Sequence, residues 1–343
     1  MPFNTMPRRL SLTALAMLGA LIPALPGQAA PAAPPPAAKA LSAGDIVKAA
    51  PAGDWVAIAP QDLLVMALAP DAKGHPRQVV IQLIPAPFSQ GWVGNLRKLA
   101  AAHWWDGLSV YRVQDNWVAQ WGDGDNEDKV KARPLPADLA KVDEREYELH
   151  GSVRKVCDQD NCIAGVEPMD WWSQSLRFDP YLFEGGAGQV GFGKGWPMGT
   201  NARTSWPIHC YGTVGVARDL SPDTGSGAEL YAVIGQPPRM LDRNIAVVGR
   251  VIEGIEHLSS LPRAPGNGVY KDTADRTPIL SIRLASDLPA EQQPHFEYLS
   301  TQSASFARYA DLRAHRHDDF IKVAATSADI CSIPMPIRRH PAS

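Results

Sequence analysis

The sequence lacks the features that specify nucleic-acid and metal chemistry. Its 343 residues carry 33 Lys and Arg against 36 Asp and Glu, a net charge of −3, and no basic cluster stands out. Because phosphate backbones are bound by a concentrated basic face, this balance argues against nucleic acid as a partner. No paired His and carboxylate ligand motif is present, so a metal-dependent hydrolase has no support. We therefore expect neither a metal nor another cofactor.

A phosphate-binding loop is also missing, although one stretch is rich in glycine. The run from Gly185 to Gly199 is not closed by a Gly-Lys-Ser/Thr sequence. Trp196 and Pro197 stand where the helix of such a loop would begin. This segment is therefore not expected to bind a nucleotide.

The N-terminal residues 1–30 have the three parts of a secretory signal. Arg8 and Arg9 precede the apolar run from Leu10 to Leu25, and small residues around Ala29 follow it. The run is short for a membrane span, and Pro23 argues against an uncleaved anchor. No Cys follows the run, which argues against a lipoprotein anchor. We expect cleavage, a periplasmic or secreted protein, and no membrane span after removal of the signal.

The sequence has four cysteines, and in an exported chain they predict disulfides. Cys157 and Cys162 could close a small loop, which would leave Cys210 and Cys331 as a long-range pair. Four cysteines allow three connectivities, and the sequence does not choose between them. A metal site formed by Cys157, Cys162 and His150 would have only three ligands at unsuitable spacing.

The rest of the chain has the composition of an ordinary globular protein, with 45% hydrophobic and 20% charged residues. Short β-type runs alternate with turn signals, and few helices are indicated, which favours a mainly β fold: a closed antiparallel β-barrel capped by helices. One predicted helix follows Pro87 and Ser89 and places Trp92 and Leu96 in the core. The strand candidates are 62–69, 78–84, 213–217, 229–234, 246–251 and 280–284.

The predicted organisation has four parts. A Pro/Ala-rich linker spans 31–44, and the barrel domain spans 45–286 with an insertion at about 124–180. An extension at 287–343 contains helical spacing between Thr301 and Phe320.

One charged residue is out of place in the β-type stretch that runs from Trp105 to Asp123. Arg112 lies among apolar and aromatic neighbours just after the turn dipeptide Asp106-Gly107. A guanidinium keeps its charge and is costly to bury alone, so it is either paired with a carboxylate or kept for a ligand. From this stretch alone, both alternatives stay open.

At these residues the sequence resembles the cyclophilins, which are peptidyl-prolyl cis/trans isomerases. The first block is Tyr111-Arg112 followed by Trp117 to Asp123, WVAQWGD. A second block in the same order as in the family runs from Gly212 to Ala217 and from Gly225 to Tyr231. It continues with Leu241-Asp242 and with Val248 to Gly254. With Val79 to Leu83, the resemblance covers roughly Gln61 to Leu284.

The resemblance implies the site residues. Arg112 would be the catalytic donor, and Gln120 would bind the substrate backbone or orient Arg112. The proline ring would lie against Trp117, Val118, Tyr231 and Leu241, although core packing is an alternative for these residues. Ala217 and Arg218 would form the edge that binds the peptide main chain, and the glycine-rich run would be a flexible rim.

The chain also departs from the family pattern. Tyr111, Trp121 and Glu229 replace the usual His, Gly and Gln, and Tyr231 adds a hydroxyl to the pocket. The leading hypothesis is a peptidyl-prolyl isomerase that acts on unfolded or proline-containing polypeptide clients in the cell envelope. The alternative is a catalytically weak cyclophilin-fold chaperone or peptide-binding module.

Overall fold

The computed structural model describes residues 41–128, 130–151, 153–158, 161–166, 189–201, 203–318 and 320–340. For 153–158 and 161–166 the description is limited to the backbone. The predicted signal peptide and most of the predicted linker lie outside these ranges, as does most of the predicted insertion beyond residue 151.

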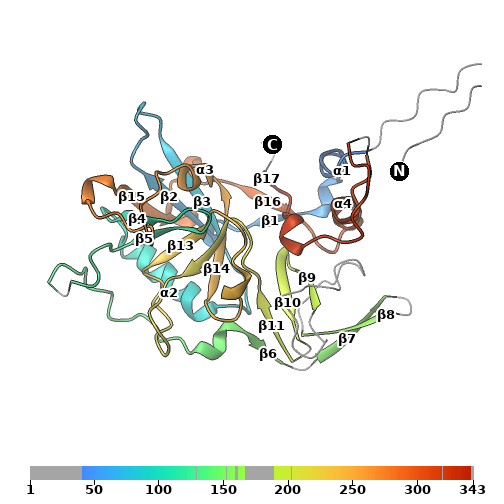
Figure 1. Ribbon diagram of the computed structural model, residues 1–343, viewed down its shortest axis with the longest axis horizontal. Helices are drawn as coiled ribbons and strands as arrows, with labels where there is room; N and C mark the ends of the chain where they lie inside the picture. The colour runs from blue at the N-terminus through green and yellow to red at the C-terminus, as the bar shows by residue number, and fades with distance from the viewer. Residues whose placement is uncertain are drawn as a thin grey trace, which may run out of the picture. The chain divides into compact units, whose positions relative to one another are not determined.

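Eight antiparallel strands close into a barrel, which confirms the predicted fold class (Figure 1). The order around the barrel is β12-β13-β5-β4-β15-β2-β3-β14, and pairing of β12 with β14 closes it. The strands are β2 (Leu63–Leu68), β3 (Arg77–Leu83), β4 (Ser109–Val113), β5 (Val118–Gly122), β12 (Thr213–Val216), β13 (Leu230–Val233), β14 (Val247–Glu253) and β15 (Thr277–Leu284).

The barrel interior is filled by every second side chain of its strands, as the two-residue period of a strand requires. On β5, Ala119 and Trp121 belong to the main core, whereas Val118 and Gln120 alternate with them. On β13, Leu230 and Ala232 face the core, and Tyr231 does not belong to it. The side chains that alternate with these core residues, Val118 and Gln120 on β5 and Tyr231 on β13, therefore form a row on the outer face of the barrel, where they can build a site.

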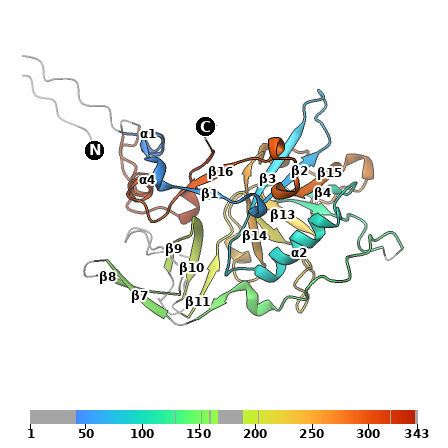
Figure 2. The ribbon, with the colours of Figure 1, turned by 180° about the vertical axis from the view of Figure 1, so that it is seen from behind.

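Helix α2 (Gln90–Ala101) packs against the barrel with the apolar face predicted from its spacing (Figure 1 and Figure 2). Trp92 and Leu96 are fully buried, as predicted. The helix begins directly after Ser89, but the Ser89 side chain makes no capping hydrogen bond. His103 lies beyond the helix end with a φ of 54°. A short helix, α3 (Glu256–Ser259), follows β14.

Part of the glycine-rich run forms regular structure, which corrects the expectation of a flexible rim. Strands β9 (Gln189–Gly193) and β10 (Trp196–Thr200) pair in a hairpin. Lys194 and Gly195, which join them, both have positive φ, as a two-residue hairpin turn requires. The complete sheet has the order β6-β11-β10-β9, with β6 (Leu149–His150) and β11 (Thr204–Pro207).

A second hydrophobic core joins segments from both ends of the described chain. Strand β16 (Phe296–Leu299) pairs with β1 (Trp55–Ile58) and with β17 (Ile337–Arg339). Helices α1 (Ala43–Ala49) and α4 (Ala304–Ala314) lie side by side in both views (Figure 1 and Figure 2). The helix predicted in the C-terminal extension is thus present, and it packs against the N-terminal lead-in.

Strands β7 (Val153–Asp158) and β8 (Asn161–Val166) form a separate hairpin. Cys157 and Cys162 lie opposite each other in its register. Their side chains lie outside the described part of the structure, so the predicted short-range pairing stays a prediction. In the described ranges, every helix falls short of the length and hydropathy that a bilayer crossing requires.

Candidate active site

Arg112 lies on β4, and its guanidinium is bound by neutral oxygen atoms. Nε donates to the Asn267 carbonyl at 2.7 Å, Nη1 to Oε1 of Gln120 at 3.0 Å, and Nη2 to Oε1 of Gln114 at 2.6 Å. Burial lowers the pKa of Arg112, and no carboxylate among the described residues pairs with it. The sequence left an ion pair and a ligand site as alternatives. The described residues show no ion pair at Arg112, and the ligand role of Arg112 stays a prediction.

Gln120 on β5 connects Arg112 to the next strand. It lies opposite Arg112 in the β4–β5 register and opposite Tyr231 in the β5–β13 register. Its Oε1 accepts from Arg112, so its Nε2 is the donor to the Tyr111 hydroxyl. Of the two roles considered for Gln120, this geometry supports the orientation of Arg112.

An apolar cluster occupies the same outer row of the barrel. It is separate from the main core and contains both pocket residues of the strands, Val118 and Tyr231. The cluster therefore contains the residues that were predicted to contact the proline ring. It also contains Ala217, one of the two residues predicted to bind the peptide main chain, and it lies next to Arg112 and Gln120. Its members are Val118, Tyr231 and Val233, which are buried, and Trp117, Ala217, Leu241 and Ile245, which are partly buried.

Arg218 holds two loops together beside this cluster and is not one of its members. Its Nε and Nη2 donate to the Asn244 carbonyl at 3.1 and 2.9 Å, and Nη1 donates to the Asp219 carbonyl at 2.7 Å. The neighbouring Ala217 N–H donates to the Glu229 carbonyl. The role of Ala217 and Arg218 as a peptide-binding edge stays a prediction.

A buried polar network that the sequence reasoning missed supports the pocket from behind. The Tyr231 hydroxyl lies 3.0 Å from Nε2 of His209, and Nδ1 of His209 lies 2.9 Å from the Asp242 carboxylate. A carboxylate only accepts, so Nδ1 carries the proton and Tyr231 donates to Nε2. The sequence contains one signal for this network: the Tyr231 hydroxyl, which requires a hydrogen-bond partner when it is buried.

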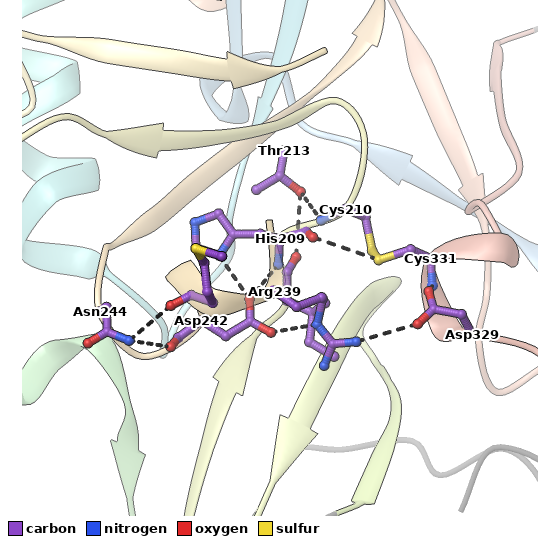
Figure 3. Close-up of polar contacts among 10 residues, drawn as sticks. His209, Cys210, Thr213, Arg239, Asp242, Asn244, Asp329 and Cys331 are labelled. Atoms are coloured by element: carbon purple, nitrogen blue, oxygen red, sulfur yellow. Dashed lines mark hydrogen bonds and ion pairs between the residues drawn. A yellow bond between two sulfur atoms is a disulfide. The ribbon is translucent and has the colours of Figure 1, made fainter. Parts of the chain in front are cut away.

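Asp242 holds three groups at once (Figure 3). Its Oδ1 also accepts from the His209 backbone N–H at 2.9 Å, and its Oδ2 accepts from Nε of Arg239 at 2.7 Å. Arg239 is itself 4% exposed and lies 3.6 Å from Asp329 in the C-terminal extension. The Tyr231 hydroxyl is therefore held by a paired charge cluster in addition to the apolar packing of its ring.

A disulfide joins the residue after His209 to the C-terminal extension. Of the three possible connectivities, the structure contains the Cys210–Cys331 pair, across 121 residues of sequence (Figure 3). Both sulfurs lie at the second hydrophobic core. Among the described residues, no group of three His, Cys, Asp or Glu side chains is arranged to hold a metal ion.

Comparison with solved structures finds related barrels. The cyclophilin AquaCyp293 from Hirschia baltica matches with a TM-score of 0.60 at 21% identity, over 83% of this chain and 92% of that one. A cyclophilin-type peptidyl-prolyl cis-trans isomerase from Cryptosporidium parvum matches with a TM-score of 0.34 at 11% identity, over 64% of this chain and 98% of that one. A search of curated proteins gives no match.

The family follows from a sequence model that covers more than half of the chain. The model of the cyclophilin type peptidyl-prolyl cis-trans isomerase family matches residues 78–284. This range contains six of the eight barrel strands in full and all of β3 except Arg77, together with Arg112, Gln120 and the apolar cluster. The resemblance and the enzyme class expected from the sequence are confirmed. The chain belongs to the cyclophilin-type peptidyl-prolyl cis-trans isomerases.

Proposed function

We propose that this protein is an exported peptidyl-prolyl isomerase in which Arg112 stabilises the twisted X-Pro amide of its clients. Rotation of this amide breaks its resonance and meets a barrier of roughly 18–20 kcal/mol. No covalent bond forms, so the site needs only to bind the twisted amide more tightly than either planar isomer. A donor aimed at the proline nitrogen meets this need, because the nitrogen lone pair localises as the amide twists.

One observation carries the proposal: a guanidinium that pairs with no carboxylate in the described part of the chain lies in the same outer row as an apolar cluster. Arg112, Gln120 and Tyr231 are linked across three adjacent strands by direct register. The cluster around Val118 and Tyr231 would receive the proline ring while Arg112 faces the amide. Trp121 is fully buried in the barrel interior, so this departure from the family pattern does not obstruct the site.

Export is the second part of the proposal. It is supported by the signal-like residues 1–30 and by the Cys210–Cys331 disulfide, since disulfides persist in oxidising compartments. The clients would be unfolded or partly folded envelope proteins that contain proline.

Replacement of Arg112 tests the proposed mechanism. We expect Arg112→Ala to lower kcat/KM for a proline-containing peptide by roughly 10²–10³-fold, the usual effect of losing one preorganised donor. Arg112→Lys should restore little, because an ammonium lacks the planar fork that binds Gln120 and the amide together. A protease-coupled assay measures the rate, and Arg316→Ala, an exposed arginine of the C-terminal extension, is the matched control.

The alternative function is a peptide-binding or chaperone module with weak turnover. It is favoured by one feature, because Nε, Nη1 and Nη2 of Arg112 each already donate to a protein oxygen. If wild type and Arg112→Ala isomerise the peptide at equal rates, the isomerase mechanism is wrong and this alternative takes its place.

A further inference from the structure

Two residues that the family pattern does not supply lie behind Gln120. Tyr111 on β4 receives a hydrogen bond from Nε2 of Gln120, and the carboxyl group of Glu229 interacts with the Tyr111 hydroxyl. Glu229 directly precedes β13, so the group bridges three adjacent barrel strands. These contacts form one chain from Arg112 through Gln120 and Tyr111 to Glu229.

Local backbone geometry directs Tyr111 toward this chain. The β4–β5 register shifts between Val110 and Arg112, so Tyr111 is the extra residue of a β-bulge. A bulge re-aims the side chain of the unpaired residue. Tyr111 is 8% exposed, and burial together with the nearby Glu229 charge raises the pKa of its hydroxyl. The hydroxyl therefore stays protonated and can donate.

Glu229 is a half-buried acid whose Oε2 atom is fully enclosed. Its Oε1 accepts from the Asp123 backbone N–H at 2.7 Å, and its buried Oε2 makes no hydrogen bond of standard geometry. Burial raises the pKa of Glu229 to about 7, against the opposing effects of the Asp123 amide and the Tyr111 hydroxyl. Gly122 makes room for this carboxyl group, because a Cβ there would overlap it.

The charged groups around Glu229 come from a few elements. The Asp123 carboxylate at the end of β5 repels it and helps to raise its pKa, and Arg112 lies beyond Tyr111 on β4. Arg276, directly before β15, reaches the Gly124 position beside Tyr111 and pairs with Asp125 at 3.2 Å. Two uncharged contacts are also present: the Ala217 N–H donates to the Glu229 carbonyl, and the Trp105 indole donates to the carbonyl of residue 228.

The protonation state of Glu229 determines which group donates each hydrogen bond between Glu229, Tyr111, Gln120 and Arg112. A carboxylate only accepts, so Tyr111 donates to it and uses its oxygen to accept from Nε2 of Gln120. Gln120 then presents Oε1 to Arg112, as observed. A protonated Glu229 can instead donate to Tyr111, which frees the Tyr111 proton to turn toward Gln120. The Gln120 amide can then flip and present its NH₂ group to Arg112, and two donors do not bond.

We propose that Glu229 and Tyr111 are positioning residues that make the isomerase pH-sensitive, with the ionised Glu229 holding Gln120 in the orientation that places Arg112. This inference rests on the proposed role of Arg112. It assigns to Glu229 a function that the glutamine usual in the family cannot perform, because a glutamine side chain does not titrate.

The test is the pH dependence of kcat/KM in wild type, Glu229→Gln and Tyr111→Phe. A protease-free solvent-jump assay is used, because a coupling protease has its own pH dependence. With a pKa of about 7, wild-type kcat/KM should fall by up to about tenfold between pH 8 and pH 6. Both variants should show a flat profile near the wild-type value at pH 6. Glu297→Gln, a buried glutamate paired with Arg338 in the second core region, should keep the wild-type profile.

Two further readouts separate this inference from the proposed function. The side-chain amide resonance of Gln120, assigned by its loss in Gln120→Ala, should shift with a midpoint near pH 7 in wild type and not in Glu229→Gln. The folded-state pKa of Glu229 exceeds its ordinary value of 4.5, so wild type should lose stability relative to Glu229→Gln as pH rises through 7.

Each outcome decides one of the two hypotheses. A Glu229→Gln profile that follows the wild type, or a Gln120 resonance that does not titrate, would overturn the positioning role even if Arg112→Ala is inactive. An active Arg112→Ala enzyme would instead contradict the proposed function, and the Gln120 resonance would still report on Glu229.

Discussion

At the scale of single residues, the hydroxyl of Tyr231 determines much of the chemistry of this pocket. It donates to a histidine that is fully buried, and that histidine is oriented by Asp242. The pocket wall thus depends on one hydrogen bond that a phenylalanine could not make. The same hydroxyl explains why a glycine, Gly215, lies opposite it on β12.

We expect Tyr231→Phe to destabilise the fold even though the ring is kept. The change leaves Nε2 of His209 buried without a partner, which typically costs about 1–3 kcal/mol. Urea denaturation would measure the loss in free energy of unfolding. Tyr211→Phe removes a hydroxyl from a side chain that is 51% exposed and should change this free energy by less than about 0.5 kcal/mol. Equal stability of the two variants would contradict the role given to His209.

Residue-level prediction of the site from the sequence depended on ordered patterns. Arg112, Gln120, Val118 and Tyr231 were found through two blocks in family order, and the structure brings them into one row. His209 was missed because a single histidine outside a pattern carries no signal of its partners. Its two contacts come from residues 22 and 33 positions away in sequence.

At the scale of elements, β12 and β13 must approach closely for the pocket to exist. Gly215 and Tyr231 are direct partners in this strand pair, and a Cβ on Gly215 would overlap the Tyr231 hydroxyl. Close approach of a side chain to a neighbouring strand is one of the reasons for glycine inside a strand. The position of the pocket tyrosine is therefore set by the neighbouring strand.

We predict that Gly215→Ala displaces Tyr231 and costs about 1–3 kcal/mol of stability, the usual effect of overpacking. It should also lower kcat/KM, since Tyr231 lines the proposed proline pocket. Gly94→Ala is the matched control, because a Cβ at this position of α2 meets no atom within 4 Å. That variant should be slightly more stable, by about 0.5–1 kcal/mol, because alanine favours a helix. Thermal unfolding and the isomerase assay would test both changes.

The elements of the barrel were easier to predict than those outside it. Strand β15 follows an alternating pattern, whereas β2 is a continuous apolar run and β3 contains a short one. The predicted ranges differ from the observed ones by a few residues. The family resemblance predicts a flexible rim for this glycine-rich run, because the family has a glycine-rich loop beside its active groove, yet the run contains the β9–β10 hairpin. Its strands are nevertheless stabilised by tertiary packing, with Phe192 and Trp196 buried.

At the scale of the whole molecule, the second hydrophobic core makes the C-terminal extension part of the fold. It contains α1 from one end of the described chain and α4 from the other, together with Phe192 and Trp206 from the β6-β11-β10-β9 sheet. Sequence patterns predicted that α4 is helical but not where it packs. The pairing of β1 with β16 spans more than two hundred residues, and periodicity carries no information about partners at that distance.

We expect loss of the Cys210–Cys331 disulfide to weaken this core more than the barrel. Closing a loop across 121 residues contributes about 3–5 kcal/mol in the chain-entropy account. Cys210→Ser/Cys331→Ser should therefore melt at a lower temperature, while isomerase activity at 25 °C is largely kept. Thermal unfolding with and without a reductant would test this. The reductant should lower the melting temperature of wild type and leave that of the double variant nearly unchanged.

The pairing of β1 with β16 and of β2 with β15 also has a consequence for the order of events during synthesis. Although β2 can pair with β3 at once, β1 meets its partner β16 and β2 meets its second partner β15 only when the last quarter of the polypeptide has emerged. Until then the nascent chain exposes unpaired strand edges and apolar side chains, so it depends on holding factors longer than a protein built from neighbouring hairpins. A peptidyl-prolyl isomerase of this design thus needs protection from aggregation while it is being made.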